Sequence, residues 1–88
     1  MKTFYEYLAE MEESGAAAER NDPAGDFALD AEADSFFPRD IKADEEGFTK
    51  IINYLYYSKY VRDIDIWTAF MDCWEMYYRE VTGSTWYW

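Results

Sequence analysis

Carboxylates are the residues of this sequence whose type and spacing could support chemistry. Four of them recur at intervals of four positions: Asp22, Asp26, Asp30 and Asp34. In a helix this interval stacks the side chains about 6 Å apart on one side. Carboxylates in such an arrangement can work as a general acid and base, hold a divalent cation or bind a basic surface.

The first two of these uses lack their remaining parts. The stretch from Asp30 to Asp34 looks like the start of a calcium loop, but the required glycine is missing and Ile41 falls at the twelfth position. The sequence has no histidine, which is the usual general base near neutral pH, and an 88-residue chain offers no obvious cleft for a sugar. We therefore expect no catalytic, cofactor-binding or metal-binding residue, and no enzyme.

The third use, binding a basic surface, agrees with the charge pattern. The formal charge is −11, and residues 1–46 carry 14 acids and 4 bases. We define the acidic face by these candidate residues: Glu6, Glu10, Glu13, Asp22, Asp26, Asp30 and Asp34. A field of this sign repels nucleic acid and anionic membrane and attracts basic proteins, so direct nucleic-acid binding is not expected.

Three interpretations of the acidic face stay open. It can be a surface that only keeps the protein in solution, as most runs of charge do. It can dock a protein partner with a basic surface. It can also mimic the phosphates of a nucleic-acid strand and inhibit a nucleic-acid-binding enzyme, as inhibitors of the anti-restriction or anti-CRISPR type do.

Aromatic residues make up 22% of the chain, more than one small core can absorb. Spacing assigns four of them to the core: Trp67, Phe70, Trp74 and Tyr77. A second set forms a candidate aromatic patch for partner binding: Tyr56, Tyr57, Tyr60, Trp86 and Trp88. Stacking on nucleic-acid bases normally requires a basic groove, so a protein interface or a homo-oligomer is the expected use.

The elements that must position these residues are helices. Large apolar residues recur every three or four positions from Ile64 to Val81, which is the pattern of an amphipathic helix. Helices are also predicted over residues 3–13, 23–33 and 44–58, and no segment alternates as a strand does. Phe36 and Phe37, before Pro38, are expected to fold back into the core. The fold class is therefore all-α, a bundle of about four helices.

The chain is predicted to be a single domain over residues 1–83, followed by an aromatic tail at 84–88. The tail either folds back on the bundle or stays exposed. Cys73, the single cysteine, lies close to the apolar stripe and is expected to be a buried structural residue. The sequence shows no signal peptide or membrane span, and we expect a cytoplasmic protein.

Several segments resemble the YozE family of small bacterial proteins. They are the opening Phe4-Tyr5-Glu6-Tyr7-Leu8, the stretch from Phe27-Ala28 through Asp34 to Phe37-Pro38, the pair Tyr54-Leu55, and Phe70, Trp74 and Tyr77. The resemblance implies a four-helix fold similar to sterile alpha motif domains, in a family whose biochemical role is not established. The matching positions are mainly apolar, so the resemblance transfers no catalytic residue.

We therefore predict a non-enzymatic helical module for protein–protein interaction, with a basic surface on its partner. The alternative is an acidic mimic of DNA or RNA. The sequence departs from the family pattern in a longer alanine-rich first loop, a more acidic first half and the Trp-Tyr-Trp end. These departures are where a property particular to this chain would lie.

Overall fold

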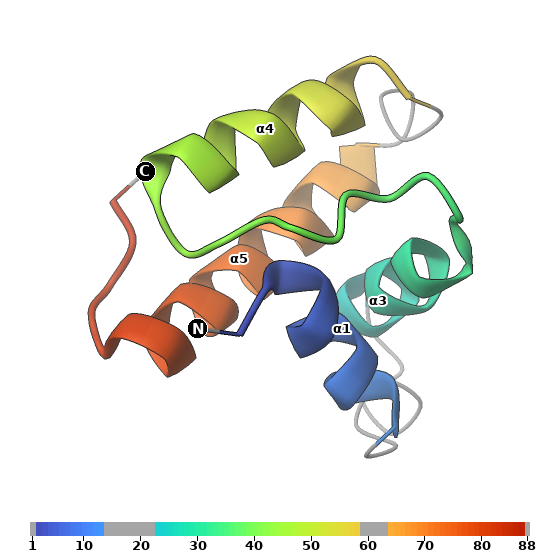
Figure 1. Ribbon diagram of the computed structural model, residues 1–88. Coiled ribbons are helices and arrows are strands. Elements are labelled where there is room, and N and C mark those ends of the chain that lie inside the picture. Colours follow the sequence, from blue (N-terminus) through green and yellow to red (C-terminus); the bar gives the residue numbers. More distant parts are fainter. Residues whose placement is uncertain (1, 14–22, 59–63, 88) are drawn as a thin grey trace.

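The computed structural model describes residues 2–13, 23–58 and 64–87. Within these ranges the chain forms four helices and no strand: α1 (Phe4–Glu13), α3 (Pro23–Ala33), α4 (Glu45–Tyr56) and α5 (Ile64–Thr82) (Figure 1). The predicted all-α bundle of about four helices is confirmed. None of the described helices is long and apolar enough to cross a membrane.

The ends of the helices follow local signals in the sequence. At α1 the Glu6 amide donates to Thr3 Oγ1 (3.2 Å) and the Thr3 amide donates to Glu6 Oε1 (3.1 Å), which together form a capping box. At α4 the Gly47 amide donates to the Asp44 carboxylate (2.7 Å). Gly83 follows α5 with φ of 76°, a left-handed conformation that favours glycine.

The core is built mainly from aromatic rings. Helix α3 packs against α1 and α5, and the side chains of the three helices meet around Phe4. The largest fully buried side chains are Trp74, Tyr77, Phe4, Phe27, Phe37, Phe70, Leu8, Ile41, Ile51, Leu55 and Cys73. The predicted core positions Phe70, Trp74 and Tyr77 and the buried Cys73 are thus confirmed, while Trp67 is half-buried at the edge of the core.

The extended segment between α3 and α4 closes one side of this core. It crosses the molecule from the end of α3 to the start of α4 (Figure 1). The Phe4 amide donates to the Ile41 carbonyl (2.8 Å), which ties the segment to the start of α1. Phe37, Ile41 and Ala43 are buried along it. Residues without helical periodicity therefore contribute to the core.

The prediction that both Phe36 and Phe37 are core residues is wrong for Phe36. Its side chain is 84% exposed, whereas that of Phe37 is 2% exposed. The cause is a turn that follows α3, in which the Phe36 amide donates to Asp34 Oδ1 (3.0 Å) and the Phe37 amide donates to the Asp34 carbonyl (3.1 Å). Only one of the two adjacent rings points inward from this turn.

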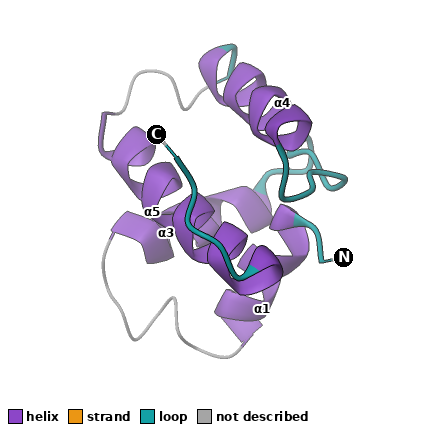
Figure 2. Cartoon of the chain, turned by 90° about the vertical axis from the view of Figure 1, so that its left-hand side faces the viewer, coloured by secondary structure: helices purple, strands orange, loops and turns teal. Residues whose placement is uncertain are grey.

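Helix α4 stands apart from the group formed by α1, α3 and α5 (Figure 2). Large side chains bridge the gap. The Phe48 ring lies 6.1 Å from that of Phe70 and 5.5 Å from that of Trp74, and the Tyr54 ring lies 5.7 Å from that of Phe37, all between centroids. Aromatic rings are long enough to fill this layer, so the position of α4 depends on them.

Candidate functional site

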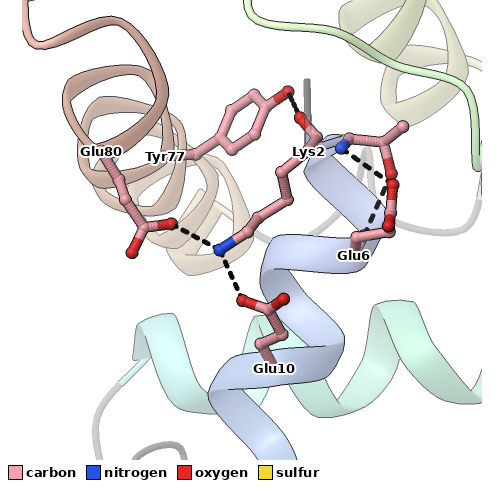
Figure 3. A network of polar contacts seen from close by, with 6 residues as sticks. Lys2, Glu6, Glu10, Tyr77 and Glu80 are labelled. Atoms are coloured by element: carbon pink, nitrogen blue, oxygen red, sulfur yellow. Dashed lines mark hydrogen bonds and ion pairs between the residues drawn. The ribbon is translucent and has the colours of Figure 1, made fainter.

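Two residues of the acidic face that lie on α1 have structural partners (Figure 3). Glu6 closes the capping box, and the hydrogen bonds from the Thr3 backbone and side chain hold the pKa of the Glu6 carboxyl below its usual range. Glu10 pairs with Lys2, whose ammonium lies 2.5 Å from Glu10 Oε2 and 3.0 Å from Glu80 Oε2. Glu13 lies on α1, but its side chain is outside the described part of the chain.

The Lys2 network joins the N-terminal segment to α5. Hydrogen bonds to Glu10 and then to Glu80 raise the pKa of the Lys2 ammonium above its ordinary value. The buried Tyr77 hydroxyl donates to the Lys2 carbonyl (2.7 Å) (Figure 3). Exposed ion pairs contribute only about 0–1 kcal/mol each, so the buried phenol is the stronger of these connections. These acids on α1 therefore hold the fold as well as carrying charge.

Tyr77 makes the fold sensitive to alkaline pH. Burial, and then the nearby carboxylates of Asp44 and Glu6, raise the pKa of the Tyr77 phenol from 10.0 to about 12. The protonated phenol is therefore favoured in the folded state. Its stabilisation is complete below pH 10 and is lost as the pH rises from 10 to about 12.

We expect the Tyr77→Phe variant to lose about 1 kcal/mol at neutral pH, because it lacks the hydrogen bond to the Lys2 carbonyl. As the pH rises from 10 to 12, the free energy of unfolding of the variant should fall by roughly 2 kcal/mol less than that of the parent. Urea unfolding followed by circular dichroism at several alkaline pH values measures both differences. Equal pH dependence in the two proteins would contradict this assignment, and titration of the remaining tyrosines cancels in the comparison.

The acids predicted on the second helix behave differently from one another. Asp30 is exposed on α3. Asp34 is half-buried after α3, where it accepts hydrogen bonds from the Tyr54 hydroxyl and the Phe36 amide. Burial, and then the bond to Asp34, raise the pKa of Tyr54 to about 12. Asp22 and the side chain of Asp26 lie outside the described residues.

The predicted aromatic patch is represented by Tyr56 and Tyr57 at the end of α4. Their side chains are 58% and 83% exposed, and their rings contact each other edge to face with centroids 5.0 Å apart. Tyr60 and Trp88 fall outside the described residues. We keep the name aromatic patch for the exposed pair Tyr56 and Tyr57.

Trp86 does not belong to that patch, which corrects the sequence prediction. Its half-buried ring packs against Phe48, Trp74 and Tyr78 at centroid distances of 4.8, 5.5 and 5.0 Å. The segment after α5 therefore folds back onto the helices, beside the start of α4 (Figure 1). Tyr57 follows Phe48 by nine residues, or about 14 Å of helix, so the two aromatic surfaces lie at opposite ends of α4.

The folded-back tail creates a groove that the sequence did not predict. We call it the C-terminal groove; it has a volume of about 350 Å³. Its lining residues come from three separate segments: Ala43, Asp44, Glu45, Tyr78, Thr85, Trp86 and Tyr87. Only the aromatic tail was visible as a signal in the sequence, because nothing in a local pattern places Tyr78 beside Asp44.

A second depression, of about 330 Å³, lies near the same end of α4 but has a different character. Its lining residues are Asp40, Lys42, Asp44, Glu46, Gly47 and Lys50, so bases accompany the acids. Lys50 and Glu46 are 3.5 Å apart and form an ion pair. Among the described residues no group of three or more potential metal ligands is found.

A family model described as the YozE SAM-like fold matches residues 3–79. This match confirms the resemblance inferred from the aromatic and apolar positions. It covers α1, α3, α4 and most of α5, and it ends before the segment that carries Trp86 and Tyr87. No curated protein and no solved structure matches the chain.

Proposed function

The chain belongs to the YozE SAM-like family, and on that premise we propose that it is a non-enzymatic module for protein–protein interaction. The partner we propose is a protein with a basic surface, since the chain has a net charge of −11. The family match supplies the fold, whereas the proposed function is argued from the surface of this chain.

One observation carries the proposal: large aromatic rings are exposed although the core is filled. The side chains of Phe36, Tyr57 and Tyr87 are each more than four-fifths exposed. Apolar rings gain free energy when they leave water, and aromatic residues are enriched among the residues that dominate protein interfaces. Exposed rings on a chain with a complete core therefore favour binding to another protein.

The position of the acids supports this function over catalysis. Glu6 caps a helix, Glu10 pairs with Lys2, and Asp34 bonds to Tyr54. Groups held in this way are poorly placed to exchange protons with a substrate. The ion pair of Glu10 with Lys2 lowers the net negative charge of this surface, which makes an acidic mimic the second candidate.

The two functions can be separated by a matched pair of double variants. Tyr56→Ala with Tyr57→Ala removes the aromatic patch, and Asp26→Lys with Asp30→Lys reverses charge on α3. Asp34 is left unchanged because it bonds to Tyr54. We expect the tyrosine variant to weaken partner binding about tenfold or more, and the lysine variant to weaken it less.

The measurement is affinity capture from a host lysate at low and raised salt, followed by titration of the purified partner. Both variants must first show the circular dichroism spectrum of the parent. The nucleic-acid mimic would replace the module if the tyrosine variant still binds the partner and the lysine variant does not. In that case raised salt or competing DNA should also release the partner. Capture of the chain by itself alone would indicate a homo-oligomer.

A further inference from the structure

Aromatic side chains make up much of the lining of the C-terminal groove. The rings of Tyr78 and Trp86 meet at 73° with centroids 5.0 Å apart. Trp86 is held in place by Phe48 and Trp74, which lie 4.8 and 5.5 Å away, so this wall rests on the core. Tyr87 adds a third ring that is 94% exposed. Three aromatic side chains therefore line one small volume, and aromatic rings are groups that attract cations.

Carboxylates complete the groove, and no base lines it. Among the residues that the structure describes, Asp44 and Glu45 are the charged ones in its lining. One oxygen of Asp44 accepts the Gly47 amide, and Glu45 forms no ion pair among the described residues. By contrast, Lys42 and Lys50 line the neighbouring depression together with its acids. The described lining of the C-terminal groove therefore holds two acids and no base, although Asp44 also lines the depression that contains Lys42 and Lys50.

One feature of the fold opposes this charge, and it is too weak to reverse it. The groove lies beside the start of α4, where the helix dipole amounts to about half a positive charge. Asp44 caps that end, and Glu45 adds a second acid in the first turn. The field of the whole chain, with a net charge of −11, has the same sign.

We propose that the C-terminal groove binds the ammonium group of a lysine side chain on the protein partner. Aromatic faces attract a cation, and Asp44 and Glu45 supply its counter-charge. The ammonium is a compact charge with three donors and needs no flat ring face to stack on, whereas the planar guanidinium stacks on one ring face. This inference rests on the proposed function, in which the partner has a basic surface. It names the contact that would recognise that surface.

The groove depends on residues that lie outside the part of the chain that matches the family model. Tyr78, Asp44 and Glu45 lie within residues 3–79, which match the family model, whereas Trp86 and Tyr87 lie beyond them. The site thus forms only when the tail packs on the family fold. Its specificity for a cation would belong to the combination of the two.

A short peptide tests the site without any knowledge of the partner. The probe is Gly-Lys-Gly with both ends blocked, titrated into the full chain labelled with ¹⁵N, with the Trp86 indole signal as the readout. We expect saturable shifts with a dissociation constant on the order of 1–10 mM, as suits a single exposed cation–π site. The same peptide with norleucine in place of lysine keeps the apolar stem without the charge, and it should bind at least about fivefold more weakly.

Two variants and two matched controls locate the binding. Glu45→Gln and Tyr87→Ala change groove residues that are exposed, so the fold is kept, and each should weaken Gly-Lys-Gly binding about threefold to tenfold. Glu46→Gln and Tyr57→Ala make the same changes outside the groove, and each should leave binding within about twofold.

The proposal is overturned if the Trp86 signal does not saturate, if the norleucine peptide binds equally well, or if the groove variants bind like their controls. Its failure is distinct from failure of the proposed function, because the peptide assay needs no partner. If the groove binds the lysine peptide but capture from the lysate yields no partner, the interaction module is overturned and the lysine site stands. If a partner is captured but the groove does not bind the lysine peptide, the lysine site is overturned and the interaction module stands.

Discussion

Replacing Phe4 by alanine is expected to remove a large part of the free energy of unfolding. The Phe4 ring is fully buried and contacts five other rings, at centroid distances of 6.3, 6.3, 5.9, 5.3 and 5.3 Å: Phe27, Phe37, Phe70, Trp74 and Tyr77. Truncation of such a residue costs about 3–5 kcal/mol, and a domain of 88 residues has only about 4–13 kcal/mol of stability. The melting temperature should fall by roughly 20 °C or more.

The matched control is Phe36→Ala, the same substitution at an exposed ring. Phe36 is 84% exposed, so its removal should change the free energy of unfolding by less than about 0.5 kcal/mol. Thermal unfolding followed by circular dichroism compares the two variants with the parent. Equal effects of the two substitutions would show that Phe4 is not at the centre of the core.

Alanine at Gly47 is expected to displace the start of α4 at a net cost of about 2 kcal/mol. A Cβ atom at this position would lie 2.1 Å from the Lys42 carbonyl oxygen and 3.0 Å from the Lys42 nitrogen. Both atoms belong to the backbone of the segment that precedes α4, so no side-chain rotation relieves the clash. Overpacking of this kind typically costs 1–3 kcal/mol, although alanine has the better helix propensity by about 1 kcal/mol.

Thr49→Ala is the control for this prediction. Thr49 lies on the same helix, two residues further along the chain, and its side chain is exposed. Its replacement should leave the free energy of unfolding within about 0.5 kcal/mol. Urea unfolding measures both variants, and a Gly47→Ala variant as stable as Thr49→Ala would contradict the close approach of Gly47 to Lys42.

The two substitutions also bear on function in different ways. Phe4 supports the whole core, whereas Gly47 sets how α4 meets the segment around Lys42 and Asp44. Asp44 and Glu45 line the C-terminal groove, and the aromatic patch lies at the other end of the same helix. A moderate displacement of α4 should therefore disturb lysine binding at the groove before the fold is lost.

The helices could be read from local patterns. The stripe from Ile64 to Val81 predicted a helix that the structure contains. The capping box at Thr3 and Glu6 and the cap at Asp44 are signals of the same local kind. These signals are local because the hydrogen bonds and the periodicity of a helix join residues only three or four positions apart. The resemblance to the YozE family then added how such helices assemble, and the family match confirms it.

Local patterns did not predict which side chains a turn exposes or where two backbone segments approach closely. Phe36 and Phe37 are identical and adjacent, yet the turn at Asp34 exposes one and buries the other. Gly47 looked unremarkable as one residue of a helix, and its role became visible only through its distance to Lys42. Both outcomes depend on the path of the backbone outside the helices, which residue type and helical periodicity do not encode.

The sequence by itself determined the all-α class, the faces of the helices, the negative charge and the surplus of aromatic rings. Only the tertiary structure decided which surplus rings are used in the fold and which are exposed. It separated Trp86 from Tyr57 and brought Trp86 together with Tyr78, Asp44 and Glu45. The physical reason is that the groove joins three segments that lie far apart in the sequence, and no local pattern encodes contacts between them.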